Sequence, residues 1–591
     1  MNMPLQDQTV LVLGLGHSGL AMARWCARLG ARVQVWDSRA QPPQADALHA
    51  ELPQATLLSG PLGAAALQGV QLLLKSPGLS PQDEQIAPLL VAAREAGIRI
   101  DGELGLFSQA LAALKAERGY APRVLAVTGT NGKTTTTAMC ALMVARCGLR
   151  VAAAGNIGPT LLDTLAQALN QEPVAEVVAE VLDAAPATAL DEVSADGQTA
   201  LFMAAPEPTA QADASGKADA VVGEDDADAE LSSSPPPLVP PPAAPVFQVL
   251  PEVWVLELSS FQLDAVQGFE PTAATVLNLS QDHLDWHGDM TAYTAAKARV
   301  FGQGTVMVVN RDDPATEALV PTTVAVRTGR GRSTVARQRT VLRFGLDAPQ
   351  RPGDYGLVEQ NGMAWLVRAR ETDPTIKRRR DEIDEIHLQR LMPADALRVR
   401  GRHNAANALA ALALAGAAGC PLAPMLHGLR EYAGEPHRLQ FVATVAGVDC
   451  YDDSKGTNVG ATVAALQGLG ADQAPGRLVV VLGGQGKGQD VSALAEPLCR
   501  FARAVVLIGQ DAAALDQALA AALAEAGVAL QQQASLEDAV RWGLAQALPG
   551  DALLLSPACA SLDMFRNYGH RGEAFARAVL AHAADLGEAV L

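Results

Sequence analysis

The stretch between residues 128 and 135 has the residue types and spacing of a loop that binds phosphate. An apolar run, Val124–Val127, predicts a buried strand, and the polar segment Thr128–Thr135 separates it from an apolar helical pattern. In such a loop, backbone N–H groups at the start of the helix point at phosphate oxygens. Lys133 is placed to reach the β- and γ-phosphates of a nucleotide, and the Thr134 hydroxyl is placed to hold Mg²⁺. Because Val127 stands where the full Walker pattern has its first glycine, this is a shortened variant, and the alternative is a tight turn between strand and helix.

A second glycine-rich loop lies near the N-terminus. Gly14, Gly16 and Gly19 follow an apolar strand pattern at Thr9–Leu13, and Asp37 lies 23 residues after Gly14 at the end of the next strand pattern. An acid at that place binds a ribose hydroxyl in nucleotide-binding sheets. The pattern favours a nucleotide moiety without identifying it. The alternative is a glycine turn that only packs a helix on a strand.

Three further polar side chains between residues 253 and 297 are candidates for chemistry. Glu257 lies at the end of the buried strand pattern Val253–Leu258, where a carboxylate suits Mg²⁺, although it could also cap a helix. His283 follows another apolar strand and could bind a metal or orient a phosphoryl oxygen, but a single loop histidine is more often structural or solvated. The local pattern around Lys297 is typical of an exposed helical lysine.

Three motifs in the last third of the chain carry hydroxyl, amide and cationic donors. They are Tyr451–Asn458, Gly483–Lys487 and Ser556–Ser561. Ligands bind outside the carboxyl ends of strands in open α/β sheets, so these motifs are candidate anion sites. Each alone could be only a turn, but all three lie in one block of the sequence.

The elements that must position these motifs alternate between strand and helix patterns. The predicted strands are Thr9–Leu13, Arg32–Trp36, Val70–Leu74, Val124–Val127, Val253–Leu258, Thr275–Asn278, Leu478–Leu482, Ala504–Ile508 and Ala552–Leu555. A further helix rich in alanine and leucine is predicted at 405–418. Such alternation predicts an α/β protein with doubly wound parallel sheets, arranged in three blocks.

Two segments interrupt the α/β pattern, and the first of them holds most of the net charge. Residues 172–247 combine acidic and alanine-rich sequence with seven prolines near their end, a composition that predicts disorder. The charged segment 371–392 predicts a solvated loop or surface helix. The 591-residue chain has a net charge of −19, of which −14 lies between Glu172 and Glu230. The negative net charge argues against a broad surface for binding nucleic acid, but not against local sites for small anions.

Cysteine usage and hydropathy indicate the compartment. The seven cysteines are scattered, with no spacing typical of a zinc site, which suits reduced thiols. We find no signal-peptide pattern and no apolar stretch long enough to span a membrane. The sequence therefore predicts a cytoplasmic protein.

At this point the chain resembles the Mur ligase family. The residues that carry the resemblance occur in family order: TGTNGKTT at 128–135, GNIG at 155–158, ELSSFQL at 257–263, DHLDWHG at 282–288, AAK at 295–297, GRHNAANALAALALA at 401–415, HR at 437–438, DDSKGTN at 452–458, LGGQGKG at 482–488 and SPACASLDMF at 556–565. Together they cover nearly the whole chain apart from the two interrupting segments. The ELSSFQL, DDSKGTN and SPACASLD motifs resemble those of the D-glutamate-adding members.

The resemblance implies three domains and an ATP-dependent amide ligase. The domains would be a Rossmann-like UDP-substrate domain at 1–120, a P-loop ATPase domain at 121–435 and a Rossmann-like domain for the amino acid at 436–591. The reaction would join D-glutamate to UDP-N-acetylmuramoyl-L-alanine through an acyl phosphate, releasing ADP and phosphate in peptidoglycan precursor synthesis. We expect ATP, two Mg²⁺ ions and these small-molecule substrates as ligands, and a monomeric protein.

The resemblance also assigns roles residue by residue. The catalytic set is Lys133, Glu257, His283 and Lys297, and the metal ligands are Thr134, Glu257, His283 and a carbamylated Lys297. The ATP site is Gly129, Thr130, Asn131, Gly132, Lys133, Thr134, Thr135, Asn404, Asn407, Arg438 and Asp453. The UDP-substrate site is His17, Ser18, Asp37, Ser38, Arg39, Gly78, Asn156 and Gln262. The D-glutamate site is Thr457, Lys487, Ser561 and Tyr568, where Tyr568 replaces the phenylalanine that is common in the family.

Three other functions stay open at this point. The first is another Mur-type or folylpolyglutamate synthase-like ligase, which the choice of amino-acid substrate distinguishes. The second is a nicotinamide dehydrogenase, which the phosphate loop and its candidate metal ligands argue against. The third is a regulatory ATP-binding module, which phosphate release dependent on both substrates would exclude.

Overall fold

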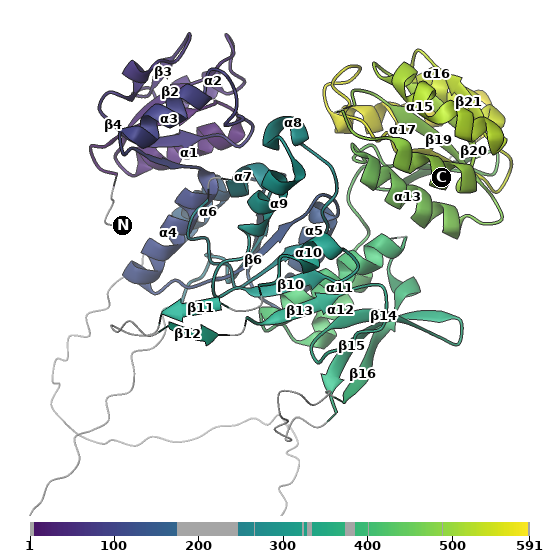
Figure 1. Cartoon of the computed structure of the whole chain (residues 1–591), viewed down its shortest axis with the longest axis horizontal. Helices are drawn as coiled ribbons and strands as arrows, with labels where there is room; N and C mark the ends of the chain where they lie inside the picture. The colour runs from purple at the N-terminus through teal and green to yellow at the C-terminus, as the bar shows by residue number, and fades with distance from the viewer. Residues whose placement is uncertain are drawn as a thin grey trace, which may run out of the picture. The chain divides into compact units, whose positions relative to one another are not determined.

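The computed structural model describes residues 5–173, 246–264, 266–321, 324–327, 334–337, 339–372, 385–399, 401–486 and 488–588. The protein is α/β, as predicted, and three parallel or mainly parallel sheets carry the motifs (Figure 1). We call them the N-terminal, middle and C-terminal sheets. The predicted disordered insertion at 172–247 lies almost wholly outside the described residues, and so does Lys487.

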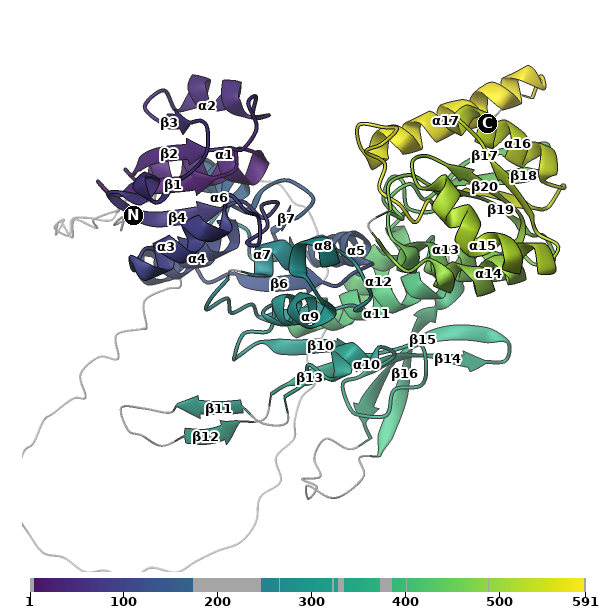
Figure 2. The ribbon, with the colours of Figure 1, turned by 45° about the horizontal axis from the view of Figure 1, so that its top comes forward.

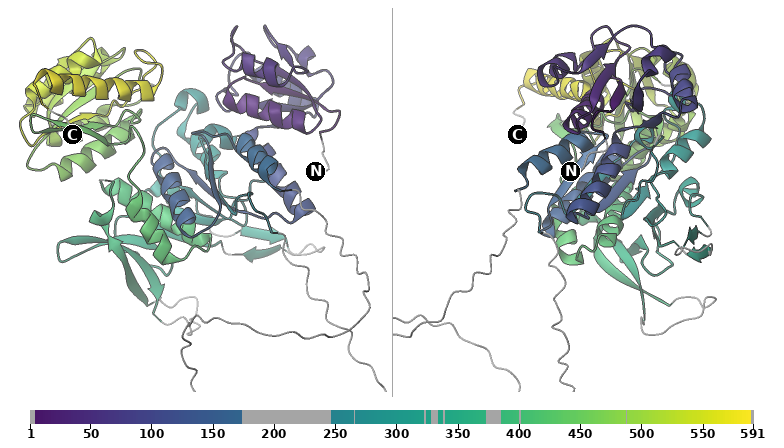
Figure 3. Two further views of the ribbon diagram at one scale, coloured as in Figure 1. Left: turned by 180° about the vertical axis from the view of Figure 1, so that it is seen from behind. Right: turned by 90° about the vertical axis from the view of Figure 1, so that its left-hand side faces the viewer.

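The N-terminal sheet has five parallel strands in the order β3-β2-β1-β4-β5. Its elements are β1 (Thr9–Leu13), α1 (His17–Arg28), β2 (Arg32–Trp36), α2 (Ala45–Glu51), β3 (Thr56–Leu58), β4 (Val70–Lys75), α3 (Ala87–Glu95), β5 (Arg99–Asp101) and the following α4 (Glu103–Arg118). Successive side chains of a strand point to opposite faces. Val10 and Val12 therefore pack with α1 and α4, whereas Leu11 and Leu13 pack with α3, and helices cover both faces (Figure 3).

The middle sheet has six parallel strands in the order β13-β10-β9-β6-β8-β7. Its elements are β6 (Arg123–Thr128), α5 (Lys133–Arg146), β7 (Val151–Gly155), α6 (Leu161–Gln171), β8 (Val253–Glu257), α7 (Ser260–Asp264), β9 (Ala273–Val276), α8 (Leu284–His287), α9 (Met290–Ala298), β10 (Val306–Asn310), α10 (Pro314–Glu317), β13 (Val341–Phe344), α11 (Arg402–Ala417) and α12 (Leu422–Glu431). Helix α11 is apolar around most of its circumference, so it is buried along its length against α5 and the sheet.

Two antiparallel elements accompany the middle sheet. Strands β11 (Val324–Arg327) and β12 (Thr334–Arg337) pair with each other, and β14 (Tyr355–Gln360), β15 (Met363–Glu371) and β16 (Ile386–Pro393) form a three-stranded sheet. The prediction of a loop or surface helix at 371–392 is therefore wrong for its last part, which is strand β16. Leu391 and Met392 of β16 are buried in the same core as α11, and this burial selects the strand.

The C-terminal sheet has six strands in the order β17-β18-β22-β19-β20-β21, of which only the β17–β18 pair is antiparallel. Its elements are β17 (Gln440–Val445), β18 (Val448–Asp452), α13 (Val459–Asp472), β19 (Leu478–Gly483), α14 (Ala495–Phe501), β20 (Ala502–Ile508), α15 (Ala512–Glu525), β21 (Ala529–Gln532), α16 (Leu536–Gln546), β22 (Ala552–Leu555) and α17 (Tyr568–Asp585). Helices α13, α14 and α15 cover one face, and α16 and α17 cover the other (Figure 2). Among the described helices, none is both long and apolar enough to cross a membrane.

Candidate active site

The predicted phosphate loop follows the buried strand β6 and ends at the start of α5. Gly129 and Gly132 have φ angles of 144° and 83°, in the region that favours glycine. A Cβ atom on Gly132 would lie 2.4 Å from Oδ1 of Asn407 on α11. Glycine at these two positions therefore allows the loop to turn and allows α11 to approach it closely. Helix α11 carries predicted ATP-binding residues.

Two lysine side chains converge on this loop, the half-buried Lys133 and the buried Lys297. The Lys133 ammonium donates hydrogen bonds to the carbonyl oxygens of Gly129 and Thr130, at 2.9 and 2.7 Å. Lys297, which is 2% exposed, donates to the same Gly129 oxygen at 2.8 Å and lies 4.7 Å from the ring centre of Tyr293. Burial lowers the pKa of both lysines, and for Lys297 the charge of Lys133 adds to the effect. The prediction of an exposed lysine from the local pattern at 297 is therefore wrong, because tertiary packing buries this side chain.

The other predicted metal ligands surround the same loop. Glu257 ends β8, beside β6, and accepts a hydrogen bond from the Asn156 side chain at 3.1 Å. His283 has a φ of 55° at the start of α8, and its ring lies 4.7 Å from that of Phe261. The Thr134 hydroxyl accepts a hydrogen bond from Arg438 at 2.9 Å.

The oxygen donors of this set fit Mg²⁺. Glu257, Asp282 and Thr134 line one cavity with the phosphate loop, and Mg²⁺ prefers carboxylate and hydroxyl oxygens. The described residues contain no cluster of three acidic, histidine or cysteine side chains that would hold a metal by themselves. In enzymes that use Mg²⁺, one or two carboxylates usually hold the ion together with phosphate oxygens of the substrate.

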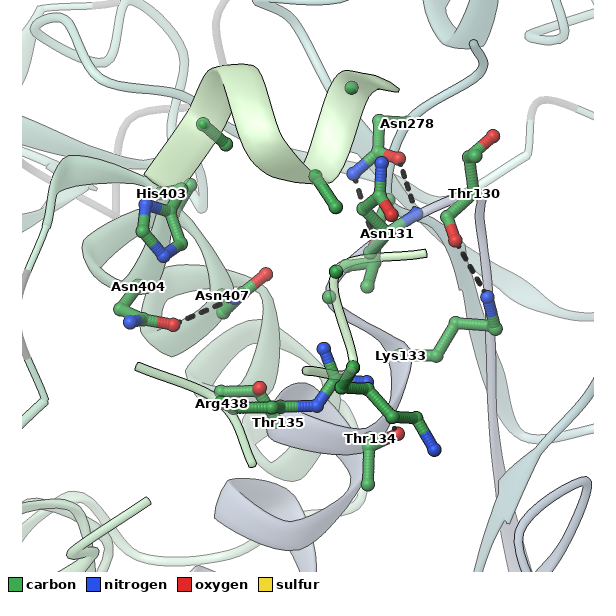
Figure 4. A pocket seen from close by; sticks show the side chains of 18 of the residues that line it. Thr130, Asn131, Lys133, Thr134, Thr135, Asn278, His403, Asn404, Asn407 and Arg438 are labelled. Carbon is green, nitrogen blue, oxygen red and sulfur yellow. Dashed lines mark hydrogen bonds between the residues drawn. The ribbon is translucent and has the colours of Figure 1, made fainter. Parts of the chain in front are cut away.

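The cavity has a volume of about 570 Å³ and joins residues from distant parts of the chain. It is lined by the phosphate loop, by Asn404 and Asn407 of α11, and by Arg438 (Figure 4). Asp453 also lines it. The Asn407 amide donates to Asn404 at 3.1 Å. Burial raises the pKa of Asp453 to about 7, although its carboxylate accepts a 2.7 Å hydrogen bond from Ser556. Every predicted ATP-binding side chain except the backbone contributor Gly129 lines this cavity.

The predicted D-glutamate residues are brought together only in part. Thr457 lines the cavity, whereas Ser561 and Tyr568 lie outside its lining. The Tyr568 ring lies 4.0 Å from the ammonium of Lys455, next to the 452–458 loop. Arg571, which is 1% exposed, donates to the backbone oxygens of Ser454 and Cys559, so it ties the 452–458 loop to the 556–561 loop.

The predicted nucleotide residues of the N-terminal sheet cluster at the ends of β1, β2 and β4. Asp37 accepts hydrogen bonds from the backbone N–H of Leu15 at 2.7 Å and from the Arg39 guanidinium at 2.8 Å. Burial acts to raise the pKa of Asp37, but these hydrogen bonds outweigh it and hold the pKa at about 2. Ser76 donates to the Gly14 oxygen, which links the loop containing Gly78 to the glycine loop. His17 and Ser18 open α1 at the same edge.

Several lining residues of the cavity were given no individual role from the sequence. They are His403, Asn278, Asp282 and Lys455. Asp282, His403 and Lys455 stand inside the motifs at 282–288, 401–415 and 452–458, so the available signal was adjacency to a predicted residue in the same motif. Asn278 had only its place at the end of a predicted strand. Burial lowers the pKa of His403 to about 4.

Comparison with family models decides the assignment. The chain matches the model described as "Mur ligase MurD-like, N-terminal domain" over residues 8–102, the "Mur ligase middle domain" over 127–204 and 246–348, and the "Mur ligase, glutamate ligase domain" over 437–559. The chain belongs to the Mur ligase family. Each matched segment contains strands of one of the three sheets, so sequence and fold agree on the assignment.

Relatives named as D-glutamate ligases are similar to this Mur ligase over almost their full lengths. A UDP-N-acetylmuramoylalanine--D-glutamate ligase of Albidiferax ferrireducens is 52% identical, covering 99% of this chain and 98% of the relative. A protein of the same name from Burkholderia mallei is 48% identical, covering 98% of each chain. Among solved structures, a MurF ligase from Thermotoga maritima in complex with ADP is 15% identical with a TM-score of 0.47, covering 99% of this chain and 96% of that one.

Proposed function

We propose that this Mur ligase uses ATP to join D-glutamate to UDP-N-acetylmuramoyl-L-alanine. The observation that carries the proposal is the single cavity in which the phosphate loop faces the 452–458 loop of the C-terminal sheet. A site that activates a carboxylate with ATP and then presents an amine needs both in one place. The near full-length similarity to ligases of that name supports the choice of substrates.

The proposed reaction has two steps. A carboxylate oxygen of the alanyl group attacks the γ-phosphorus of ATP, and the bond from that phosphorus to the β–γ bridging oxygen breaks to release ADP. The D-glutamate amine then attacks the acyl carbon of the resulting acyl phosphate. The tetrahedral intermediate collapses by breaking the carbon–oxygen bond to phosphate, which leaves with the electron pair, and the nitrogen loses a proton to solvent.

The residues around the phosphate loop would stabilise the first step. Lys133 leaves its two carbonyl acceptors to meet the β- and γ-phosphates, and its charge opposes the charge that spreads over the transferring group. Thr134 and Glu257 would hold one Mg²⁺, which supplies further charge neutralisation when bound with ATP. Asn404, Asn407, Arg438 and Asp453 would bind the rest of the nucleotide.

Lys297 would serve the second metal position, with His283, only after chemical change. An ammonium cannot bind a cation, but a carbamate formed by its neutral amine with carbon dioxide offers oxygen ligands. Burial favours the neutral amine at Lys297, because it lowers the pKa of the side chain. We therefore propose a carbamate at this position and two Mg²⁺ sites in total.

The remaining assignments are those that the family resemblance implies. We propose that the ends of β1, β2 and β4 bind the uridine diphosphate, that Asn156 and Gln262 bind the sugar and alanine, and that Thr457, Lys487, Ser561 and Tyr568 bind D-glutamate. We also propose the three-domain division at residues 120 and 435, and a monomer that acts in the cytoplasm.

Phosphate release by the purified full chain tests the proposed function. Phosphate should appear only when ATP, Mg²⁺, UDP-N-acetylmuramoyl-L-alanine and D-glutamate are all present. Replacing D-glutamate by L-glutamate or diaminopimelate should give at most a small fraction of that rate. Equal or faster release with diaminopimelate would transfer the protein to another branch of the family, and release without either substrate would remove the ligase assignment.

A further inference from the structure

A pair of asparagine side chains joins the phosphate loop to the C-terminal sheet. The Asn131 amide donates to Oδ1 of Asn458 at 3.2 Å, and the Asn458 amide donates back to Oδ1 of Asn131 at 3.0 Å. The two residues are 327 positions apart in the sequence. Asn458 is 5% exposed and Asn131 is half-buried, so water competes less for these hydrogen bonds than it would at an exposed site.

Each partner of this pair is itself held rigidly. The Asn278 side chain accepts a hydrogen bond from the Asn131 backbone N–H at 2.8 Å and donates to the Asn131 carbonyl at 3.1 Å, so the Asn131 peptide is clamped on both sides (Figure 4). Asn458 caps the N-terminus of α13 by accepting from the Ala461 N–H at 2.8 Å. Both side chains therefore meet in fixed orientations.

The surroundings of the pair are built for close contact. A Cβ atom on Gly460, in the first turn of α13, would lie 3.1 Å from the Ser280 hydroxyl and 3.3 Å from the Asn131 amide nitrogen. These distances are tighter than ordinary contacts, so glycine lets α13 approach the phosphate loop. The Val459 N–H next to the cap donates to Gln489, two residues beyond Lys487. One short segment thus connects the phosphate loop with a loop that the proposed function assigns to D-glutamate.

We propose that the Asn131–Asn458 pair positions the two halves of the reaction relative to each other. This inference rests on the proposed function, because it assigns the phosphate loop to the ATP that activates the carboxylate and the 452–458 loop to the amine that attacks. Two neutral amides can align these loops without adding negative charge beside the phosphates, whereas a carboxylate in the same place would add it. Both asparagines are positioning residues, since they act through the loops that carry them.

A double-mutant cycle tests the positioning role. Asn131→Ala removes the side chain and keeps the backbone bonds to Asn278, and Asn458→Ser keeps a helix-capping oxygen while it removes the amide pair. Either change breaks the same two hydrogen bonds, so each should lower kcat about tenfold, and the double variant should also lose only about tenfold. The KM for ATP should stay within about threefold, and the melting temperature should stay close to that of the parent.

Ser535→Ala is the matched control, because Ser535 caps the N-terminus of α16, another helix that packs on the C-terminal sheet. Ser535 makes no hydrogen bond to the phosphate loop among the described residues. The Ser535→Ala change should lower stability and leave kcat unchanged. Losses in the two single variants that multiply to about a hundredfold in the double variant, or kcat values within about twofold of the parent, would overturn the inference. A parent protein that releases no phosphate with D-glutamate would overturn the proposed function instead, and the two failures are therefore distinguishable.

Discussion

Replacing Lys133 by methionine is the most direct perturbation of the phosphate loop. Methionine keeps an unbranched apolar side chain of similar length and removes only the ammonium, which donates to the Gly129 and Thr130 carbonyl oxygens at 2.9 and 2.7 Å. Those oxygens belong to the loop that precedes the N-terminus of α5, where the β- and γ-phosphates would bind. Removing one preorganised donor from a developing negative charge typically costs about 10²–10³ in kcat, or about 3–4 kcal/mol.

The stability cost should be much smaller than the catalytic cost. Two neutral-acceptor hydrogen bonds disappear, which would destabilise the fold by about 1 kcal/mol each. Burial already lowers the pKa of Lys133, so removing its charge also removes a desolvation penalty that opposes folding. The net change in the free energy of unfolding should therefore be about 1 kcal/mol or less.

Steady-state phosphate release, together with urea unfolding, separates the two quantities. Lys133→Met should reduce kcat at least about a hundredfold at saturating substrates, with an unfolding midpoint close to that of the parent. A folded variant that keeps kcat within about tenfold would refute the reasoning, because the loop would then not stabilise phosphoryl transfer. A variant with lost activity and a collapsed unfolding transition would instead contradict the stability argument.

Four further predictions follow from the same geometry. Burial holds the pKa of Asp453 at about 7, above the pKa of this carboxyl in the unfolded chain. The free energy of unfolding should therefore fall as pH rises from about 4 to about 7, and Asp453→Asn should flatten this pH dependence in urea unfolding. Lys297→Ala should be inactive, and formate should partly restore phosphate release; no rescue by any short-chain carboxylate would weaken the carbamate proposal. Lys487→Ala should raise the KM for D-glutamate far more than that for ATP, whereas equal increases would argue against its substrate role. Deleting residues 174–245 should leave kcat within about threefold of the parent value. The Glu172 carboxylate accepts backbone hydrogen bonds from residues 248–250, so the chain segments on either side of the deletion are already joined. A folded deletion variant without activity would contradict this prediction.

The sequence predicted the strands that are buried on both faces. The predicted bounds of Thr9–Leu13, Arg32–Trp36 and Ala552–Leu555 are those of β1, β2 and β22. Runs of apolar residues followed by glycine, aspartate or serine define such strands without tertiary information. The predicted phosphate-loop segment follows β6 and Asp37 follows β2, at the strand ends where the sequence pattern put them.

Features that depend on contacts between distant segments were not predicted. Strand β16 lies beside a highly charged stretch, and only its packing in the core around α11 stabilises it as a strand. The burial of Lys297 results from α9 packing against the phosphate loop, and the residues near it in sequence give no sign of it. The Asn131–Asn458 pair joins residues that no local pattern connects.

Isotope transfer from the UDP-linked substrate tests the central claim most directly. UDP-N-acetylmuramoyl-L-alanine labelled with ¹⁸O in both carboxylate oxygens is incubated with ATP, Mg²⁺ and D-glutamate, and both products are analysed by mass spectrometry. The account predicts one ¹⁸O atom in the released phosphate and one in the new amide carbonyl, with the product heavier by one glutamyl residue. Unlabelled phosphate, or a product without the added glutamyl residue, would contradict it.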